Sequence, residues 1–507
     1  MQTINEAALQ DTSLPEARQT MNRAGAGSVV AAAVLATFYL VTSIYVSSHR
    51  LLWFDEVFTV HMARLPDWAT ILAALSHGAD SLPPAYYLVV RTFGKLLGRG
   101  EVAVRLPSTL AMVATLLIIF DCARRLSDGL HGLIALALAS IPLAGEGFEA
   151  RSYAIYIMLA ALALWVWTYT GVSEKMSAIL FGMVLFLAVS FHYYAVLLLV
   201  PYALWEISRW RPWQRPSPKL IAGVIGVVVP AALLSHFILS FSRKFATGFW
   251  SRPSLRELTE IYSHIFVGGL FILALIAIWI VLVDRKNKSF LLESMPSGEV
   301  VGWLFLCIPL AGFIAAELKT NAFAVRYFLV LVPGVAVAFS CWVWRNFRDA
   351  PRVSLGIFLL LATWGVANEM QVVLQPSVVE TPGTRAYLGL EGTLRDEGKR
   401  FLVFSDPFLF LEAQYYSKYP GECILLLPPD FEKEVSAGRP DPYMHQRVEQ
   451  ILSHYYPLQF WRTGQLREHA QQAALIKPAP DVLQAMEQAG FDAKVRFSQP
   501  VKVVYLQ

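Results

Sequence analysis

Residues 28–48 have the sequence SVVAAAVLATFYLVTSIYVSS, which contains no charged side chain. A run of about 20 apolar residues is long enough to cross the hydrocarbon core of a bilayer as a helix. The preceding residues 1–27 are polar, and the run is longer than the core of a signal peptide. We therefore expect a retained membrane anchor that follows a cytoplasmic N-terminal tail.

The composition of the whole chain indicates a polytopic membrane protein. Of its 507 residues, 56% are hydrophobic and 16% are charged, whereas roughly 25% of the residues in soluble domains are charged. The formal net charge of +4 is small, and the absence of a Lys- or Arg-rich block argues against a nucleic-acid partner. The four cysteines have neither the spacing of a zinc site nor that of a disulfide framework.

Apolar stretches recur along the chain, and one of them is too long for a single membrane helix. Residues 177–207 would form a helix of roughly 46 Å, well beyond a hydrocarbon core of about 30 Å. The run Phe191-His192-Tyr193-Tyr194 interrupts this stretch, which predicts two short helices. The stretches then predict about eleven transmembrane helices, at 28–48, 107–120, 130–146, 152–170, 177–207 (two helices), 220–240, 263–283, 300–317, 327–344 and 353–371.

Lys and Arg residues between the stretches predict the orientation of the helices. Membrane proteins concentrate these side chains in cytoplasmic loops. With eleven crossings, the basic clusters all fall on the cytoplasmic side, namely Arg124 and Arg125, Lys175, Arg209 to Lys219, Arg285 to Lys288, and Arg345 to Arg352. The outer face then holds a first external loop at 49–106 and the C-terminal residues 372–507.

Residues 372–507 differ in composition from the transmembrane region 28–371. Strand-like runs occur at 401–404, 424–427 and 501–506, and helix-like stretches lie at 384–397, 408–418, 443–455 and 480–489. This alternation predicts a small extracytoplasmic α/β domain. From its position, we expect this domain to cap an external cavity or to engage an acceptor.

Three carboxylates are expected near the outer ends of membrane helices. Asp55 and Glu56 follow the first span, and Glu149 precedes the fourth. Ionisable groups beside a span are costly to desolvate, and two neighbouring carboxylates can raise the pKa of one of them. Such a carboxylate can act as a general base. The alternative is that Asp55 or Glu56 pairs with Arg64 or Arg105 and holds the loop in place.

Arginines on the same face could bind a phosphate. Arg326 lies at the outer end of the tenth span, Arg105 at the start of the second, and Arg151 two residues after Glu149. A guanidinium group matches the geometry of a phosphate. Contact with lipid headgroups is the other interpretation of an arginine at such a position.

His77 lies in the first external loop. It is followed by the rigid step Pro83-Pro84 and by Tyr86 and Tyr87, which suits a kinked helix at the membrane interface. A single His is more often a hydrogen-bonded interfacial side chain, and no second His lies at ligand spacing. A divalent metal ion would therefore be held mainly by carboxylates.

An ordered set of motifs resembles a known family. The motifs are Trp53-Phe54-Asp55-Glu56, His77 with Pro83-Pro84-Ala85-Tyr86-Tyr87, Glu101 with Arg105-Leu106-Pro107-Ser108, Glu149-Ala150-Arg151-Ser152-Tyr153, His192-Tyr193-Tyr194, and Arg326-Tyr327 with Pro333. Over roughly residues 30–345 the chain resembles the bacterial protein-mannosyltransferase and aminoarabinose-transferase relatives among the GT-C membrane glycosyltransferases. One departure is that five residues separate His77 from Pro83, where the family often has His directly before two prolines.

The resemblance implies an enzyme that takes a sugar from a polyprenyl-phosphate donor and transfers it to a lipid, glycan or protein. The reaction would take place outside the cytoplasmic membrane of a bacterium. In this family Asp55 corresponds to the catalytic carboxylate, Glu56 lies beside it, and Glu149 resembles the acidic residue of the second external loop. Deprotonation of the acceptor hydroxyl by Asp55 and in-line attack predict inversion at the sugar carbon.

The resemblance also implies which residues stabilise the leaving group and which residues line the cavity. A phosphate leaving group needs cations for its developing charge, and Arg326, Arg105 or Arg151 would supply them. The residues expected in the donor and acceptor cavity are His77, Tyr86, Tyr87, His192, Tyr193 and Tyr327.

Three other classes of function remain open. A glycan ligase or polymerase would use a lipid-linked oligosaccharide at the same external site. A secondary transporter would carry ionisable residues near the bilayer midplane and an inverted repeat, whereas the charges here gather at the outer ends of the spans. A scaffold whose external domain binds partners would not require carboxylates and arginines on one face.

Overall fold

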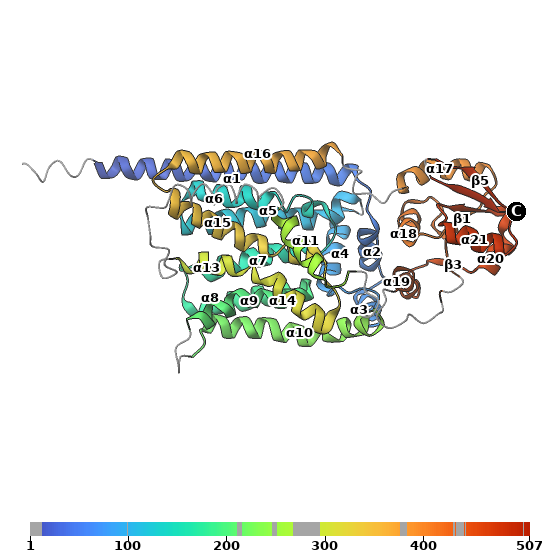
Figure 1. Cartoon of the computed structure of the whole chain (residues 1–507), viewed down its shortest axis with the longest axis horizontal. Coiled ribbons are helices and arrows are strands. Elements are labelled where there is room, and N and C mark those ends of the chain that lie inside the picture. The colour runs from blue at the N-terminus through green and yellow to red at the C-terminus, as the bar shows by residue number, and fades with distance from the viewer. Residues whose placement is uncertain are drawn as a thin grey trace, which may run out of the picture.

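The computed structural model describes residues 13–506, apart from 99, 210–214, 246–250, 267–294, 376–382, 429–430, 432–440, 442 and 500. Figure 1 shows a bundle of helices with roughly parallel axes and, beyond one end of it, a unit that contains a β-sheet. Three short helices lie at the end of the bundle that faces this unit: α2 (Phe54–Ala63), α3 (Trp68–Ser76) and α4 (Ala85–Leu97).

Six helical segments among the described residues are long and apolar enough to cross a membrane. They are Ala26–His49 within α1 (Ser13–His49), α5 (Glu101–Leu126), α8 (Glu174–Phe191), α10 (Pro218–Phe245), Ser297–Thr320, which comprises α13 (Ser297–Leu304), α14 (Cys307–Ala315) and η5 (Ala316–Thr320), and α16 (Pro351–Leu374). The chain is therefore a multi-pass membrane protein.

Shorter helices complete the bundle. Those in the described residues are α6 (Gly129–Ser140), η1 (Glu146–Phe148), α7 (Tyr153–Thr168), η2 (Tyr193–Leu198), α9 (Leu199–Ser208), α11 (Leu255–Phe266), η6 (Val325–Phe328) and α15 (Leu331–Phe347). Most of α15 is buried, as expected of an apolar helix at the centre of a bundle. The span expected at 263–283 lies largely outside the described residues.

The break expected within residues 177–207 is confirmed. Helix α8 ends at Phe191, His192 has an extended backbone, and η2 begins at Tyr193. The ring Nδ1 of His192 accepts the backbone N–H of Tyr194 at 3.2 Å and so caps η2. The stretch therefore forms two helices joined at a polar step.

Small residues allow α8 and α10 to approach each other closely. A Cβ atom added at Gly226 of α10 would overlap the backbone oxygen of Gly182 on α8. Close packing of small residues is a common basis of helix association in membranes. This contact sets the position of α10, whose Ile238 and Phe241 line the cavity described below.

Contacts of α5 identify the two ends of the bundle. Glu101, its first residue, accepts a hydrogen bond from Tyr416 of the sheet-containing unit at 3.0 Å. Arg124 and Arg125, in its last turn, lie about 35 Å further along the helix axis. These two arginines therefore lie at the end of the bundle remote from the sheet.

Residues 384–506 form the sheet-containing unit, which is an α/β structure. Its sheet has the strand order β3-β2-β1-β4-β6-β5, with parallel pairing from β3 to β4 and antiparallel pairing of β6 with β4 and β5. The strands are β1 (Phe401–Phe404), β2 (Cys423–Leu426), β3 (Gln459–Trp461), β4 (Ala473–Ile476), β5 (Ala493–Phe497) and β6 (Val503–Leu506). The helices are α17 (Thr384–Asp396), α18 (Pro407–Tyr416), η8 (Pro420–Glu422), α19 (Met444–Ser453), α20 (Thr463–Glu468), η9 (Ala470–Gln472) and α21 (Pro480–Gln488).

Sequence patterns predict about half of the strands in this unit. The runs at 401–404, 424–427 and 501–506 correspond to β1, β2 and β6, and the four helix-like stretches correspond to α17, α18, α19 and α21. The patterns miss β3, β4 and β5. Strand β4 is buried at all four residues and lacks alternation, and β3 has only three residues, so neither shows a strand period.

Candidate active site

The carboxylate of Asp55 lies between two arginines from distant parts of the chain. Asp55 is in the first turn of α2, Arg151 just precedes α7, and Arg326 is in η6. Arg326 donates from Nη1 to Oδ2 of Asp55 at 3.1 Å, and Nε of Arg151 lies 3.8 Å from the same oxygen. The fold thus brings together three of the residues that the sequence analysis selected.

Electrostatics keep Asp55 ionised. Burial opposes its ionisation, but the charges of Arg151 and Arg326 outweigh burial and hold the pKa of Asp55 below its usual value. The side chains of Asp55 and Arg326 are 18% and 26% exposed. A substrate can therefore reach both partners of this ion pair.

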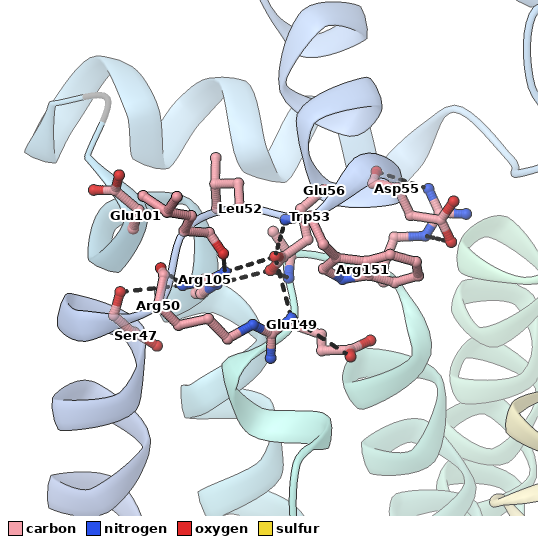
Figure 2. Close-up of polar contacts among 12 residues, drawn as sticks. Ser47, Arg50, Leu52, Trp53, Asp55, Glu56, Glu101, Arg105, Glu149 and Arg151 are labelled. Atoms are coloured by element: carbon pink, nitrogen blue, oxygen red, sulfur yellow. Dashed lines mark hydrogen bonds and ion pairs between the residues drawn. The ribbon is translucent and has the colours of Figure 1, made fainter. Parts of the chain in front are cut away.

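Glu56, the neighbouring carboxylate, is enclosed by donors (Figure 2). Arg105 donates from Nε to Oε1 at 2.7 Å and from Nη2 to Oε2 at 2.6 Å. The backbone N–H groups of Ala150 and Trp53 donate to the same carboxylate at 2.7 and 3.1 Å, and Arg50 does so at 3.4 Å. Burial opposes ionisation, but Arg105 and Arg50 hold the pKa of Glu56 below its usual value.

Arg105 uses its whole guanidinium group inside this network. Besides Glu56, it donates to the backbone oxygens of Ser47, Arg50 and Leu51 at 3.1, 2.8 and 2.8 Å. Its side chain is fully buried. Because a guanidinium group has five N–H donors and all five are bonded here, Arg105 lies against Glu56 as a structural partner rather than at an open phosphate site.

A second pair of carboxylates, Glu146 and Glu149, lies in the turn between α6 and α7. Glu149 is 19% exposed, and its Oε1 is 3.8 Å from Nη2 of Arg50. Burial raises the pKa of Glu149 despite the charge of Arg50. Burial and the charge of Glu149 raise the pKa of Glu146 to about 8. The sequence analysis did not select Glu146, although its position three residues before Glu149 indicates that it lies in the same external turn.

An apolar cavity of about 170 Å³ lies next to η6. Three of the predicted cavity residues, His192, Tyr193 and Tyr327, line it. Burial and the charges of Arg151 and Arg326 lower the pKa of His192 to about 3, so its ring is neutral. The other lining residues are Ser81, Leu82, Tyr194, Val196, Leu197, Ile238, Phe241, Ser242, Ala315, Thr320 and Ala322.

Aromatic rings connect this cavity with the ion pair of Asp55. The guanidinium of Arg326 lies 5.4 Å from the ring centroid of Tyr153, in a cation–π contact. The ring of Tyr153 lies 6.1 Å from that of Tyr327, which lines the cavity. The ion pair and the cavity therefore share one aromatic wall.

Tyr86 and His77, two further predicted cavity residues, lie away from the cavity. The hydroxyl of Tyr86 is buried and hydrogen-bonded to Ser108 at 3.0 Å. The ring of His77 is exposed and is hydrogen-bonded to Tyr455 of the α/β unit. Both residues therefore connect structural elements instead of lining the cavity.

Tyr87 reaches the site indirectly, through Asp80. Its hydroxyl donates to Oδ2 of Asp80, and the same oxygen lies 3.7 Å from Nη1 of Arg151. Asp80 is thus a second acidic partner of Arg151 that the sequence analysis did not select. Its signal is its place in the loop before Pro83.

The α/β unit also contacts the first turn of α2. The ring of His445 on α19 lies 5.3 Å from the ring of Phe54, the residue before Asp55, and 4.6 Å from that of Phe408 on α18. Burial lowers the pKa of His445, and the charge of Asp55 opposes this shift. Nothing in the sequence around residue 445 indicates this proximity, because it arises from the docking of two separate folded units.

The described residues contain no group of three or more His, Cys, Asp and Glu side chains arranged to hold a metal ion. The divalent metal ion therefore stays a prediction.

Comparisons with known proteins agree with the motifs. Residues 81–236 match the family of dolichyl-phosphate-mannose-protein mannosyltransferases. No curated protein matches the chain by sequence. The fold is similar to that of ArnT from Cupriavidus metallidurans in the apo state, with a TM-score of 0.62 and 11% identity over 95% of this chain and 98% of that chain.

A second structure is ArnT from the same organism bound to undecaprenyl phosphate. It has a TM-score of 0.59 and 11% identity, and the similarity covers 94% of this chain and 97% of that chain. At this level of identity the likeness concerns the fold. The family match over residues 81–236 and the shared fold together make the chain similar to the GT-C membrane glycosyltransferases of the protein-mannosyltransferase and ArnT type.

Proposed function

We propose that the protein transfers a sugar from a polyprenyl-phosphate donor to an acceptor hydroxyl on a lipid, glycan or protein. The observation that carries this proposal is the pairing of Asp55 with Arg326 and Arg151 beside an apolar, aromatic-walled cavity. A carboxylate can accept the proton of a hydroxyl, and guanidinium groups can hold a phosphate. The undecaprenyl phosphate bound to an ArnT of the same fold supports the class of donor.

In the proposed reaction, the acceptor oxygen attacks the anomeric carbon of the sugar while the bond from that carbon to the phosphate oxygen breaks. The hydroxyl proton passes to the carboxylate of Asp55. The leaving polyprenyl phosphate takes the bonding electrons, and Arg326 and Arg151 stabilise its charge. A single displacement of this kind inverts the configuration at the sugar carbon.

Binding of the donor would itself activate the base. In the structure Arg326 lowers the pKa of Asp55 and thereby weakens it as a base. A donor phosphate that takes up the guanidinium of Arg326 withdraws this stabilisation, so the pKa of Asp55 rises toward the value that suits proton transfer. The acceptor would then be deprotonated only when the donor is in place.

The neighbouring residues take supporting roles in this proposal. Glu56 and Arg105 join the ends of α1 and α5 to the start of α2 and so orient Asp55. Glu146, whose pKa is raised to about 8, can donate a hydrogen bond from its protonated carboxyl group to a sugar or acceptor oxygen, and Glu149 lies three residues further along the same turn. His445 of the α/β unit packs on Phe54, the residue before Asp55, so this unit can influence the position of Asp55.

We further propose eleven membrane crossings, with the active site and the α/β unit outside the cytoplasmic membrane of a bacterium. The positions of Arg124 and Arg125, remote from the α/β unit, support this orientation through the preference of cationic residues for the cytoplasmic side. The transmembrane catalytic domain would then comprise residues 28–371, and residues 372–507 the external domain.

The first experiment measures sugar transfer or release from a panel of polyprenyl-phosphate monosaccharides by the purified full-length protein. Asp55→Asn is expected to lower turnover about 10²-fold or more, the usual contribution of a general base. Asp67→Asn is the matched control, because Asp67 is exposed on the same loop and caps α3 through Thr70, a role that asparagine also fills.

Two outcomes contradict the proposal. If folded protein turns over no monosaccharide donor but transfers a lipid-linked oligosaccharide, the protein is a glycan ligase or polymerase. If Asp55→Asn retains turnover equal to that of Asp67→Asn, Asp55 is not the base.

A further inference from the structure

A second cavity, of about 480 Å³, lies between the C-terminal part of α2, helix α4 and the start of α5. We call it the α2–α4 groove. Its lining residues are Val60, Ala63, Arg64, Leu65, Pro66, Val90, Arg91, Gly94, Lys95, Gly98 and Val104. It shares no residue with the cavity beside η6.

The groove is cationic on one side and apolar on the other. Its described lining residues include Arg64, Arg91 and Lys95 and no carboxylate. Arg91 donates to the backbone oxygens of Ala63, Leu65 and Pro66 at the end of α2, and these hydrogen bonds fix its position. The carboxylate of Asp67, which is not among the lining residues, interacts with its charge. The charge of this groove is complementary to an anionic group.

The groove lies beside the first turn of a candidate membrane span and beside exposed apolar side chains. Helix α4 exposes the apolar side chains of Leu88, Leu96 and Leu97, which are 50%, 74% and 57% exposed. Exposed leucines on a helix that also carries cations are typical of a helix lying in the interface between headgroups and acyl chains. Val104 is in the first turn of α5, where this candidate membrane span begins.

Helix α2 separates the groove from the catalytic carboxylate. Val60 and Ala63, four and seven residues after Glu56, lie on the same side of the helix as Glu56 and line the groove. Asp55 and Thr59 both contact Arg151 and do not line the groove. A ligand in the groove would therefore lie on the side of α2 that carries Glu56 and would not contact Asp55.

Two glycines line the groove, and the space beside them is open. A Cβ atom added at Gly94 or Gly98 would meet no other atom within 4 Å. Helix interiors generally disfavour glycine, by about 1 kcal/mol relative to alanine. The space above Gly94, in the third turn of α4, is therefore available to a ligand.

We propose that the α2–α4 groove binds the headgroup of an anionic phospholipid of the surrounding membrane, with its acyl chains beside Leu96 and Leu97. The phosphate would lie near Lys95 and Arg91, and the apolar side of the groove would receive the glycerol backbone. Such a lipid would stabilise the position of α2 by contacting the side of this helix that carries Val60 and Ala63. This inference does not depend on the proposed function, because its test needs no turnover.

The test is native mass spectrometry of the full-length protein in detergent, titrated with phosphatidylglycerol or phosphatidylcholine. Phosphatidylglycerol is expected to bind at several-fold lower concentration than phosphatidylcholine. Lys95→Glu, which reverses a charge in the groove, is expected to weaken phosphatidylglycerol binding by at least threefold. Gly94→Phe, which fills the groove without changing charge, is expected to weaken the binding of both lipids.

Lys418→Glu is the matched control, because Lys418 is exposed in the α/β unit and does not line the groove. It makes the same change in net charge and is expected to leave lipid binding unchanged. Thermal unfolding of each variant shows whether it is folded.

Three outcomes would overturn the proposal. The first is equal binding of the two lipids, and the second is equal loss of binding in Lys95→Glu and Lys418→Glu. The third is displacement of the lipid by soluble glycerol phosphate at the same concentration, which would assign the groove to a free anion.

Discussion

Arg326 donates a hydrogen bond to Asp55 at 3.1 Å across 271 positions of sequence. This pair links the tenth predicted span to the first external loop, and it joins the candidate base to the candidate phosphate ligand. Each partner therefore controls the chemistry of the other. The pH dependence of turnover should report this coupling.

Removing Arg326 should make Asp55 a stronger base, but it should also lower the rate of sugar transfer. In Arg326→Gln the pKa of Asp55 rises, because one of the charges that lower it is gone. Activity requires the ionised carboxylate, so the acid limb of the kcat/KM profile should move to higher pH. Turnover at its optimum should fall by about 10²-fold, because the leaving phosphate loses a cation.

The measurement is the pH profile of sugar transfer by the wild type and Arg326→Gln. Arg256→Gln is the control, since Arg256 is an exposed residue of α11 paired only with its helix neighbour Glu260 among the described contacts. An acid limb that stays in place in Arg326→Gln would contradict the coupling.

Glu56→Gln should affect stability more than chemistry. The substitution leaves the buried guanidinium of Arg105 without its bidentate anionic partner. Breaking a buried ion pair from one side costs about 3–5 kcal/mol. The midpoint of thermal unfolding should therefore fall clearly.

Glu260→Gln is the matched control for this prediction. It breaks the exposed pair with Arg256, and surface pairs contribute only about 0–1 kcal/mol. Equal midpoints for the two variants would show that the network around Glu56 does not stabilise the fold.

Glu146 should make the protein less stable as the pH rises. Its carboxyl group has a pKa near 8 in the folded chain and a usual value of 4.5. The folded state therefore binds more protons than the unfolded state between these values, and stability falls with increasing pH across that window. Glu146→Gln, which cannot ionise, should flatten this dependence.

The measurement is the unfolding midpoint of wild type and Glu146→Gln between pH 5 and pH 8.5, with Glu174→Gln as the control. Glu174 is exposed at the start of α8. The prediction fails if wild type and Glu146→Gln lose stability in parallel over this range.

His445 should support turnover through its packing on Phe54. His445→Ala removes the ring that contacts Phe54 and Phe408, so the first turn of α2 loses a neighbour and turnover should fall several-fold. His445→Phe keeps a ring of similar size and should restore most of the rate. The measurement is sugar transfer by the two variants. His454→Ala, at the exposed end of α19, is the control. An equal loss of turnover in His454→Ala and His445→Ala would show that any substitution in α19 lowers turnover, whatever its contact with Phe54.

Hydropathy and helix length determine the framework of this protein without any tertiary information. A membrane span must be apolar and about 20 residues long, so residues 28–48 are recognisable as one. The same limit requires the break at His192, which the structure confirms. The motifs also indicate that Asp55, Arg151 and Arg326 belong to one site.

Tertiary structure alone decides between the two adjacent carboxylates. Side chains of consecutive helical residues point about 100° apart, and either Asp55 or Glu56 could have faced the cavity. In the folded chain Glu56 points toward Arg105 of α5 and the backbone of Ala150, whereas Asp55 points toward Arg326. Arg105 is buried for the same reason, although its sequence position resembles that of an open phosphate ligand.

The place of the α/β unit is likewise a tertiary property. Strand and helix periods identify its elements one by one, but they carry no information about which surface docks on α2. The contacts of Tyr416 with Glu101 and of His445 with Phe54 depend on the complementary shapes of two folded units. Sequence therefore determines which segments enter the membrane, and packing determines which charges remain open to a substrate.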